Sequence, residues 1–323
     1  MDSKMRTVLL TNYYGKGPLG VIRECAPSGL ELLALDRPGR QAILERAPLA
    51  DYLLVGGRVK IDREILAVAE RLKMIQRTGI GTDSIDLEAA AERDIPVYVN
   101  KGINARSVAE HTLLLMLSVL RKLRTADASV RAGYWSKHDL GIQCHDLFGK
   151  AVGLVGMGSI GRIVAELLKP FRVRLLYTQR HRLPADEDGA LGIEYRTFAD
   201  LIADSDIVSL HCPLTPATTG LLGPGEINAM KPGAVVINTA RGAVIDEPAL
   251  AAALRTGKIA GAGLDAFVQE PLPVASPLRT LDNVVLTPHL AGITAETFQQ
   301  MMVAAFASIE RFDAAREMVS IER

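Results

Sequence analysis

A glycine-rich turn in the middle of the chain constrains its fold more than any other feature. The apolar run 151–155 leads into Gly-Met-Gly-Ser-Ile-Gly, and a helical pattern of apolar residues follows. Gly156, Gly158 and Gly161 thus have G-x-G-x-x-G spacing between a predicted strand and a predicted helix. In that context the glycines permit a tight turn, close approach of a pyrophosphate, and close helix–strand packing. The turn therefore predicts an α/β unit that binds a dinucleotide phosphate at the helix N-terminus.

Short apolar runs alternate with helical patterns along the whole chain, which predicts parallel sheets with helices on both faces. In the longest helical stretch, Ser107 and Glu110 have the spacing of a capping box. The expected strands are 7–10, 53–55, 74–76, 97–99, 151–155, 173–177, 207–210, 234–238, 260–264 and 284–287. The expected helices are 62–71, 104–124, 159–168, 197–201, 225–230, 247–256 and 295–316.

This order of elements predicts two doubly wound parallel-sheet domains of the α/β class. A Rossmann-like dinucleotide-binding domain is expected over residues 103–290. A flavodoxin-like substrate-binding domain is expected from residues 1–102 and 291–323, because the last helical segment has an apolar side that we expect to return to the first domain.

Composition excludes several classes of function. The 323 residues include 37 Lys and Arg and 37 Asp and Glu, so no basic excess suggests a nucleic-acid partner. The most apolar run, 113–120, is too short to span a membrane, and the first residues lack the apolar core of a signal peptide. Three widely spaced cysteines fit neither a disulfide framework nor a metal site. We therefore expect a cytoplasmic protein without a metal.

The residues after the second strand of the dinucleotide unit favour NADP(H) over NAD(H). An NAD enzyme places Asp or Glu on the ribose hydroxyl about 20 residues after the glycine turn. Thr178, Gln179 and Arg180 stand there instead, and no acid accompanies them. An arginine suits a 2′-phosphate because its guanidinium donates two parallel hydrogen bonds. NAD(H) remains possible if this arginine faces solvent.

Three isolated polar residues, Arg241, Glu270 and His289, each follow a predicted strand. Ligands of open α/β sheets bind beyond the carboxyl ends of the strands. Reduction of a 2-oxo acid requires a proton for the developing alkoxide and a cation for the carboxylate. His289 can exchange the proton, Glu270 can orient the imidazole and favour its charged form, and Arg241 can bind the carboxylate. The other histidines, His111 among them, are weaker candidates for a catalytic role.

At these residues the chain resembles the D-isomer-specific 2-hydroxyacid dehydrogenases. That family carries the Arg-Gly, Glu-Pro and Pro-His motifs in this order after the same glycine turn. The resemblance covers nearly the whole chain and includes the motifs at 79–86, 107–111 and 211–215. It implies hydride transfer between a nicotinamide cofactor and a small 2-oxo or 2-hydroxy acid.

The resemblance also implies the residues that line the site. Backbone groups at two loops of the first domain would bind the substrate carboxylate, and Asp265 would lie near the cofactor carboxamide. The implied substrate residues are Val55, Gly56, Gly57, Arg77, Gly79, Ile80, Arg241 and His289. The implied cofactor residues are Gly156, Met157, Gly158, Ser159, Ile160, Gly161, Thr178, Gln179, Arg180, His211, Cys212, Pro213, Thr239, Ala240, Arg241, Asp265, His289, Ala291 and Gly292.

The expected substrate and the expected oligomeric state are inferred from resemblances to particular members of the family. Segments 176–180 and 270–273 resemble those of glyoxylate/hydroxypyruvate reductases, and Gly56-Gly57 leaves little side-chain bulk near the expected pocket. A phosphoglycerate dehydrogenase-type enzyme, with Arg77 contacting an anionic group, and a dinucleotide-sensing corepressor on the same fold are the alternatives. Related enzymes are dimers with an arm near Trp135, so we expect a homodimer. Trp135 then either reaches the partner's pocket or serves as an anchor in the interface or in the core.

Overall fold

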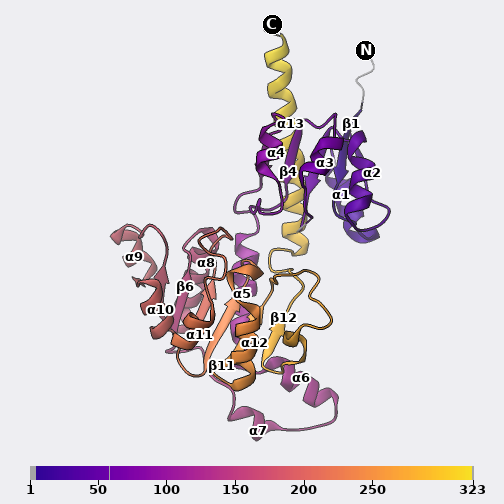
Figure 1. Cartoon of the computed structure of the whole chain (residues 1–323). Helices are drawn as coiled ribbons and strands as arrows, with labels where there is room; N and C mark the ends of the chain where they lie inside the picture. The colour runs from indigo at the N-terminus through magenta and orange to yellow at the C-terminus, as the bar shows by residue number, and fades with distance from the viewer. Residues whose placement is uncertain (1–4, 58, 322–323) are drawn as a thin grey trace. The chain divides into compact units, whose positions relative to one another are not determined.

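The computed structural model describes residues 5–57 and 59–321 and divides into two compact units. Unit 1 consists of residues 1–104 and 293–323, and unit 2 consists of residues 105–292. Each unit is an α/β structure around one parallel sheet, which confirms the predicted fold class (Figure 1). These limits lie two residues from the boundaries expected from the sequence.

Unit 2 contains a seven-stranded sheet in the order β12-β11-β10-β9-β6-β7-β8. Every strand pair is parallel, and the order reverses between β6 and β9, as in a doubly wound dinucleotide fold. The strands are β6 (Ala151–Val155), β7 (Arg174–Thr178), β8 (Ile193–Tyr195), β9 (Ile207–Leu210), β10 (Ala234–Asn238), β11 (Ile259–Leu264) and β12 (Val284–Leu286).

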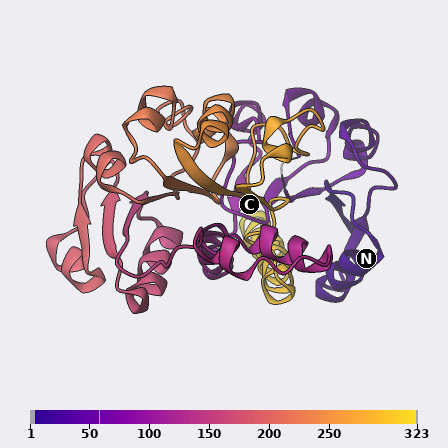
Figure 2. The ribbon, with the colours of Figure 1, turned by 90° about the horizontal axis from the view of Figure 1, so that it is seen from below.

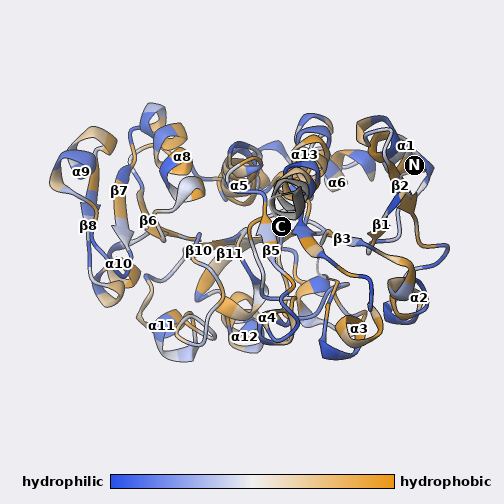
Figure 3. Ribbon diagram, turned by 90° about the horizontal axis from the view of Figure 1, so that it is seen from above, coloured by the Kyte–Doolittle hydropathy of each residue, from blue (hydrophilic) through white to orange (hydrophobic). Residues whose placement is uncertain are grey.

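Helices cover both faces of this sheet, because alternate residues of each buried strand point to opposite sides. On one face, Leu154 and Tyr177 pack with α5 (Ala105–Leu120) and α8 (Ser159–Leu168). On the other face, Leu176 and Val236 pack with α10, α11 and α12, as the two rows of helices in Figure 3 show. The remaining helices are α9 (Ala185–Leu191), α10 (Phe198–Asp204), α11 (Pro224–Ala229), α12 (Glu247–Thr256), η2 (Lys169–Phe171), η3 (Gly242–Val244) and η4 (Pro277–Thr280).

The segment after α5, which we call the arm (residues 121–148), extends away from this sheet (Figures 1 and 2). It carries α6 (Leu123–Arg131) and α7 (Lys137–Gly141), neither of which has a buried residue. Trp135, between them, is 81% exposed. A cavity of about 540 Å³ lies between the arm and the amino ends of the strands, at the edge of the sheet opposite to the predicted site residues.

Unit 1 contains a five-stranded parallel sheet in the flavodoxin-like order β2-β1-β3-β4-β5. Val8, Leu10 and Tyr52 face α1 and α13, whereas Leu9 and Leu53 face the opposite row of helices. The elements are β1 (Arg6–Leu10), α1 (Lys16–Cys25), β2 (Leu30–Leu33), α2 (Arg40–Arg46), η1 (Ala47–Leu49), β3 (Tyr52–Val55), α3 (Arg63–Val68), β4 (Met74–Arg77), α4 (Leu87–Ala91), β5 (Val97–Val99) and α13 (Ala295–Ile321).

The structure corrects several predicted elements. The helix expected over 104–124 ends at Leu120, because Lys122 adopts a left-handed conformation with φ 50° and α6 then begins. Ser107 lies inside the first turn of α5, and Glu110 pairs with Arg106 at 2.8 Å, so the predicted capping box at Ser107 is wrong. The edge strands β2 and β8 were not expected from the sequence. No helix in the described part of the chain is long and apolar enough to cross a membrane.

Candidate active site

Every predicted site residue of unit 2 lies just beyond, or at, the carboxyl end of a strand. The glycine turn joins β6 to α8, and Thr178 ends β7. The other predicted residues follow β9, β10, β11 and β12 in turn. Because all these strands are parallel, their carboxyl ends share one edge of the sheet, where ligands of open α/β sheets bind.

The glycine turn has the shape that its sequence predicts. Gly156 has φ 103°, and a Cβ there would lie 2.9 Å from the carbonyl group of His211. A Cβ on Gly161 would lie 2.2 Å from the Gly156 carbonyl oxygen, so α8 could not pack so closely with any other residue. Beside Gly158, in contrast, a Cβ would meet no atom within 4 Å. The turn therefore leaves open space next to the α8 N-terminus, where the N-cap residue, Gly158, has no side chain to cap the backbone N–H groups.

The two arginines that follow β7 differ in their contacts. Arg182 pairs with Asp188 at 3.3 Å, and its guanidinium lies over the ring of Tyr195. Arg180 is exposed and makes no hydrogen bond or ion pair within the described residues. Gln179 accepts a hydrogen bond from the backbone N–H of Met157 at 3.3 Å, which ties this loop to the glycine turn.

Glu270 holds the His289 imidazole with both carboxylate oxygens. Nδ1 of His289 lies 2.9 Å from Oε2 and 3.1 Å from Oε1. A carboxylate only accepts hydrogen bonds, so Nδ1 carries the proton in this contact and Nε2 is left to exchange one. The side chains are 34% exposed for His289 and 15% exposed for Glu270, so the imidazole remains accessible. The backbone N–H of Phe267 donates to Oε1 of Glu270 at 2.9 Å and fixes that carboxylate.

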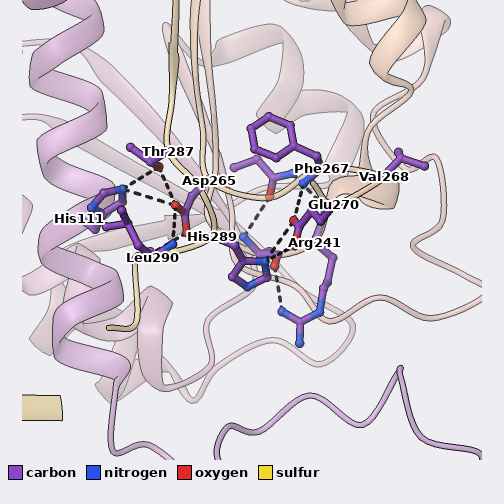
Figure 4. A network of polar contacts seen from close by, with 12 residues as sticks. His111, Arg241, Asp265, Phe267, Val268, Glu270, Thr287, His289 and Leu290 are labelled. Carbon is purple, nitrogen blue, oxygen red and sulfur yellow. Dashed lines mark hydrogen bonds and ion pairs between the residues drawn. The ribbon is translucent and has the colours of Figure 1, made fainter. Parts of the chain in front are cut away.

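The Arg-Gly motif brings Arg241 beside this pair. The Asn238 side chain makes two hydrogen bonds to the backbone of this turn. Its amide NH₂ donates to the Arg241 carbonyl at 2.9 Å, and its oxygen accepts from the backbone N–H of Ala240 at 3.0 Å. A Cβ on Gly242 would lie 1.9 Å from the backbone of Phe267, so only glycine lets the Arg241 turn approach the loop that carries Glu270. Figure 4 shows the guanidinium, the Glu270 carboxylate and the imidazole together.

Asp265 is buried on the other side of His289 and holds the backbone that follows it. Its side chain is 1% exposed, and Leu290 and Ala291 each donate a backbone N–H to its carboxylate at 2.9 Å. The Thr287 hydroxyl donates to the same carboxylate at 2.6 Å. His111, from α5, lies 3.0 Å from that hydroxyl. His111 and Thr287 were missed in the sequence, because their contact joins residues 176 positions apart.

The loop after β9 supplies two groups that burial keeps uncharged. Burial lowers the pKa of His211 to about 4 and raises the pKa of the Cys212 thiol to about 11. Nε2 of His211 lies 2.9 Å from the Ser209 hydroxyl. In the next loop Thr239 is buried, and its hydroxyl lies 2.9 Å from that of Thr112 in α5.

In unit 1 the predicted substrate residues follow β3 and β4. Arg77 is buried, and its guanidinium donates to the carbonyls of Gly81 at 2.8 Å and Val55 at 3.1 Å. It thereby joins the two loops that the resemblance assigns to the substrate carboxylate. Gly79 and Ile80 lie in the second of these loops, and Ile80 is exposed.

The two glycines after β3 are required by their neighbours in the structure, whereas the sequence suggested only that they leave room in the substrate pocket. A Cβ on Gly56 would lie 2.8 Å from the Tyr14 hydroxyl, and a Cβ on Gly57 would lie 2.9 Å from the Asn12 amide nitrogen. The absence of side chains at these two positions therefore makes room for Tyr14 and Asn12, which follow β1. Burial raises the pKa of Tyr14 to about 12, against the opposing charge of Arg77. The order of the sheet reverses between β1 and β3, so both residues lie at its switch point.

Comparison with known proteins identifies the class to which this fold and site belong. Residues 113–291 match the family model described as D-isomer specific 2-hydroxyacid dehydrogenase, NAD binding domain. A glyoxylate reductase from Aeropyrum pernix is 38% identical over 307 residues, which cover 90% of this chain and 91% of that protein. The chain belongs to the D-isomer specific 2-hydroxyacid dehydrogenase family.

Two further relatives show the breadth of this similarity. A D-3-phosphoglycerate dehydrogenase from Mycobacterium leprae is 41% identical over 267 residues, which cover 83% of this chain. The chain spans about half the length of that relative, since the match covers 50% of it. Among solved structures, the TT0316 protein from Thermus thermophilus is similar with a TM-score of 0.82 and 37% identity, over 93% of this chain and 94% of that one.

Proposed function

We propose that the protein is a reductase that converts small 2-oxo acids into D-2-hydroxy acids, with NADPH preferred as the hydride donor. The observation that carries this proposal is the His289 imidazole, which is bound by both oxygens of Glu270 and lies beside Arg241. The D configuration follows from the family.

The residues of unit 2 fit a nicotinamide dinucleotide. The open space beside Gly158 and the uncapped N-terminus of α8 suit a pyrophosphate, since free N–H groups and the helix dipole attract anions. Asp265 suits a carboxamide N–H. An ionised carboxylate has about four acceptor positions. Among the described residues, two hydrogen bonds occupy Oδ1 and one occupies Oδ2, so Oδ2 retains a position.

Preference for NADPH is supported by the loop after β7. Arg180 is exposed and free of protein partners among the described residues, so its guanidinium can receive a phosphate without breaking an ion pair. Thr178, Gln179 and Arg180 include no carboxylate. A carboxylate at this place would bind a ribose 2′-hydroxyl and repel a 2′-phosphate.

When bound, the cofactor would supply the hydride, and the side chains supply the proton and the charge. As the carbonyl is reduced, the His289 imidazolium donates its Nε2 proton to the developing alkoxide. Glu270 accepts from Nδ1 throughout, so it keeps the ring oriented and stabilises the imidazolium. Arg241 binds the carboxylate and polarises the carbonyl, and its effect is largest where negative charge develops. In the reverse direction neutral His289 accepts the hydroxyl proton.

Small polar acids are the proposed substrates, and glyoxylate and hydroxypyruvate are the first to test. The similar glyoxylate reductase supports this choice, and its match extends over nearly the whole of both chains. A phosphoglycerate dehydrogenase-type activity is the second candidate, supported by the relative that is 41% identical.

We also propose that the enzyme is a cytoplasmic homodimer. The arm exposes Leu123, Val130, Tyr134, Trp135 and Ile142, which is more apolar surface than a short segment usually leaves in solvent. A second copy of the chain could cover these side chains. The three cysteines are free, as is usual in a reducing compartment.

The test is the initial rate of NADPH and of NADH oxidation with glyoxylate, hydroxypyruvate, 3-phosphohydroxypyruvate, pyruvate and a bulky 2-oxo acid. The proposal expects fast turnover of the first two with NADPH, and chiral analysis of the product as the D acid. A kcat/KM that is highest for the phosphorylated acid would favour the second candidate instead.

Other outcomes would contradict parts of the proposal. A preference for NADH would remove the assignment of Arg180 but leave the acid–base chemistry in place. Tight dinucleotide binding without turnover of any acid would favour a dinucleotide-sensing protein on the same fold.

A further inference from the structure

The backbone at His289 has a conformation that its surroundings must maintain. His289 has φ 55°, in the left-handed region that few residues other than glycine adopt. Its N–H donates to the Thr287 carbonyl at 3.0 Å, which closes a tight turn directly after β12. Since the side chain leaves from this turn, relaxation of the backbone would move the imidazole away from its position.

One buried carboxylate fastens both ends of this turn. Before His289, the Thr287 hydroxyl donates to Oδ1 of Asp265 at 2.6 Å. After His289, the N–H of Leu290 donates to Oδ1 and that of Ala291 to Oδ2, each at 2.9 Å. The strained residue is therefore enclosed by three hydrogen bonds to a single acceptor group.

The direction of the next hydrogen bond follows from counting hydrogens. A threonine hydroxyl has one hydrogen, and Thr287 gives it to Asp265. Its contact with Nε2 of His111, at 3.0 Å, must then be one in which the ring nitrogen donates. His111 is nearly buried, and burial lowers its pKa, although Asp265 opposes this shift. The ring is therefore neutral near pH 7 and carries its hydrogen on Nε2.

We propose that His111 and Thr287 are positioning residues that act on His289 through Asp265. The Nε2–H of His111 donates to Thr287, which donates to Asp265, which holds the turn that presents the His289 imidazole (Figure 4). This inference rests on the proposed function in that His289 is taken as the acid–base group. It assigns α5, a helix outside the loops of the site, a role in aligning the proton donor.

Replacement of the central hydroxyl tests this chain of donors. Thr287→Val keeps the size of the side chain but removes the hydroxyl, and we expect kcat to fall at least about 10-fold, because small misplacements of a reacting group are costly. The KM for the 2-oxo acid should change less, because Arg241 still binds its carboxylate. Thr287→Ser restores the hydroxyl and should return kcat to within about threefold of the unaltered enzyme. His111→Leu should act like Thr287→Val.

A matched control separates alignment from general loss of stability. Ser205 is fully buried in unit 2, and its hydroxyl donates to the Leu201 carbonyl at 2.6 Å, near the amino end of β9. Ser205→Ala should lower the thermal unfolding midpoint without a comparable loss of kcat. If Thr287→Val has the kcat of the unaltered enzyme, or if Thr287→Ser does not recover activity, the proposal is wrong.

A spectroscopic measurement judges the proposal even if no 2-oxo acid is turned over. In ¹⁵N-labelled protein, the ring nitrogens of each histidine report which one carries the hydrogen, and His111→Gln assigns the signal of His111. We expect the Nε2–H form near pH 7, with its hydrogen exchanging faster in Thr287→Val. A ring protonated on Nδ1 instead would overturn the chain of donors. Absence of turnover by the unaltered protein would contradict only the proposed function.

Discussion

At the scale of single residues, the two ring nitrogens of His289 have different roles in the proposed mechanism. Nδ1 donates to Glu270, and Nε2 exchanges the proton with the substrate. His289→Asn removes the group that exchanges the proton, and we expect kcat for reduction to fall roughly 10²–10⁴-fold. NADPH affinity, measured by its fluorescence on titration, should change much less than kcat, because the glycine turn and most of the other residues assigned to the cofactor are unaltered. A kcat within a few-fold of the unaltered value would remove His289 from its assigned role.

Glu270→Gln tests the electrostatic part of the same pair. The amide keeps a hydrogen-bonding group near Nδ1 but no longer stabilises the imidazolium. Loss of the negative charge beside the ring should lower kcat for reduction about 10-fold or more, whereas the KM for the 2-oxo acid should change less. Steady-state kinetics measure both values, and an unchanged kcat would contradict the role assigned to the carboxylate.

Arg180 and Arg182 form a natural pair for testing cofactor choice. Arg180→Ala should raise the Kd for NADPH about 10-fold or more and leave that for NADH nearly unchanged, since a charged hydrogen bond to phosphate contributes roughly 1.5–3 kcal/mol. Arg182 already pairs with Asp188, so Arg182→Ala should affect the two dinucleotides equally. Equal losses for both cofactors in Arg180→Ala would exclude it as the 2′-phosphate contact.

At the scale of elements, the glycine turn separates folding from binding. Gly161→Ala places a Cβ against the Gly156 carbonyl, and overpacking of this kind costs roughly 1–3 kcal/mol. Gly158→Ala meets no atom, so the free energy of unfolding should stay within about 0.5 kcal/mol of its original value. It should nevertheless weaken dinucleotide binding, because the new methyl group fills the space proposed for the pyrophosphate. Urea unfolding and NADPH titration of both variants measure the two effects.

The arm is the element whose exposed apolar side chains support the proposed homodimer. If a second copy covers it, Ile142→Glu should produce a monomer in light scattering after size exclusion, because a charge would be buried at the interface. Lys137→Glu, on an exposed polar position of the same arm, serves as the control for added negative charge. A protein that is already monomeric without substitution would refute the proposed homodimer.

At the scale of the whole molecule, buried neutral histidines make stability depend on pH. Burial lowers the pKa of His211 from its ordinary value of 6.5 to about 4. At a pH between these two values the unfolded chain binds a proton on this residue, whereas the folded chain does not. The contribution of His211 to stability is therefore fully present above about pH 6.5 and is lost as the pH decreases towards 4. His211→Gln should flatten the decline by up to about 1.4 kcal/mol per pH unit, measured from urea unfolding at several pH values.

Local patterns predicted most of this architecture, and distance along the chain explains what they missed. β6, β9, β10 and α8 have the predicted bounds, because strands buried on both faces read as continuous apolar runs and an amphipathic helix has a period of 3.6 residues. The edge strands β2 and β8 are only partly buried, and each contains a glutamate, so neither reads as a continuous apolar run. The break after α5 depends on the backbone of Lys122, which has no local sequence signal.

The candidate site likewise contains residues that local sequence patterns identify and residues that they miss. The glycine turn and the trio of Arg241, Glu270 and His289 could be identified because each stands in a recognisable motif after a strand. His111 and Thr287 could not, because an ordinary helical histidine and an ordinary threonine acquire meaning only when the fold brings them together. The need for glycine at position 242 likewise follows from the backbone of Phe267, which lies 25 positions later.

The return of α13 to unit 1 sets an order of events during synthesis. Met301, Met302, Phe306 and Ile309 complete the core on one face of the β1–β3–β4 sheet, yet the ribosome makes them after all of unit 2. Unit 2 is one uninterrupted segment, so it can finish folding while that face is still exposed on the nascent chain. Translation arrest shortly before residue 295 would therefore leave an apolar sheet face uncovered, the kind of surface that chaperones recognise.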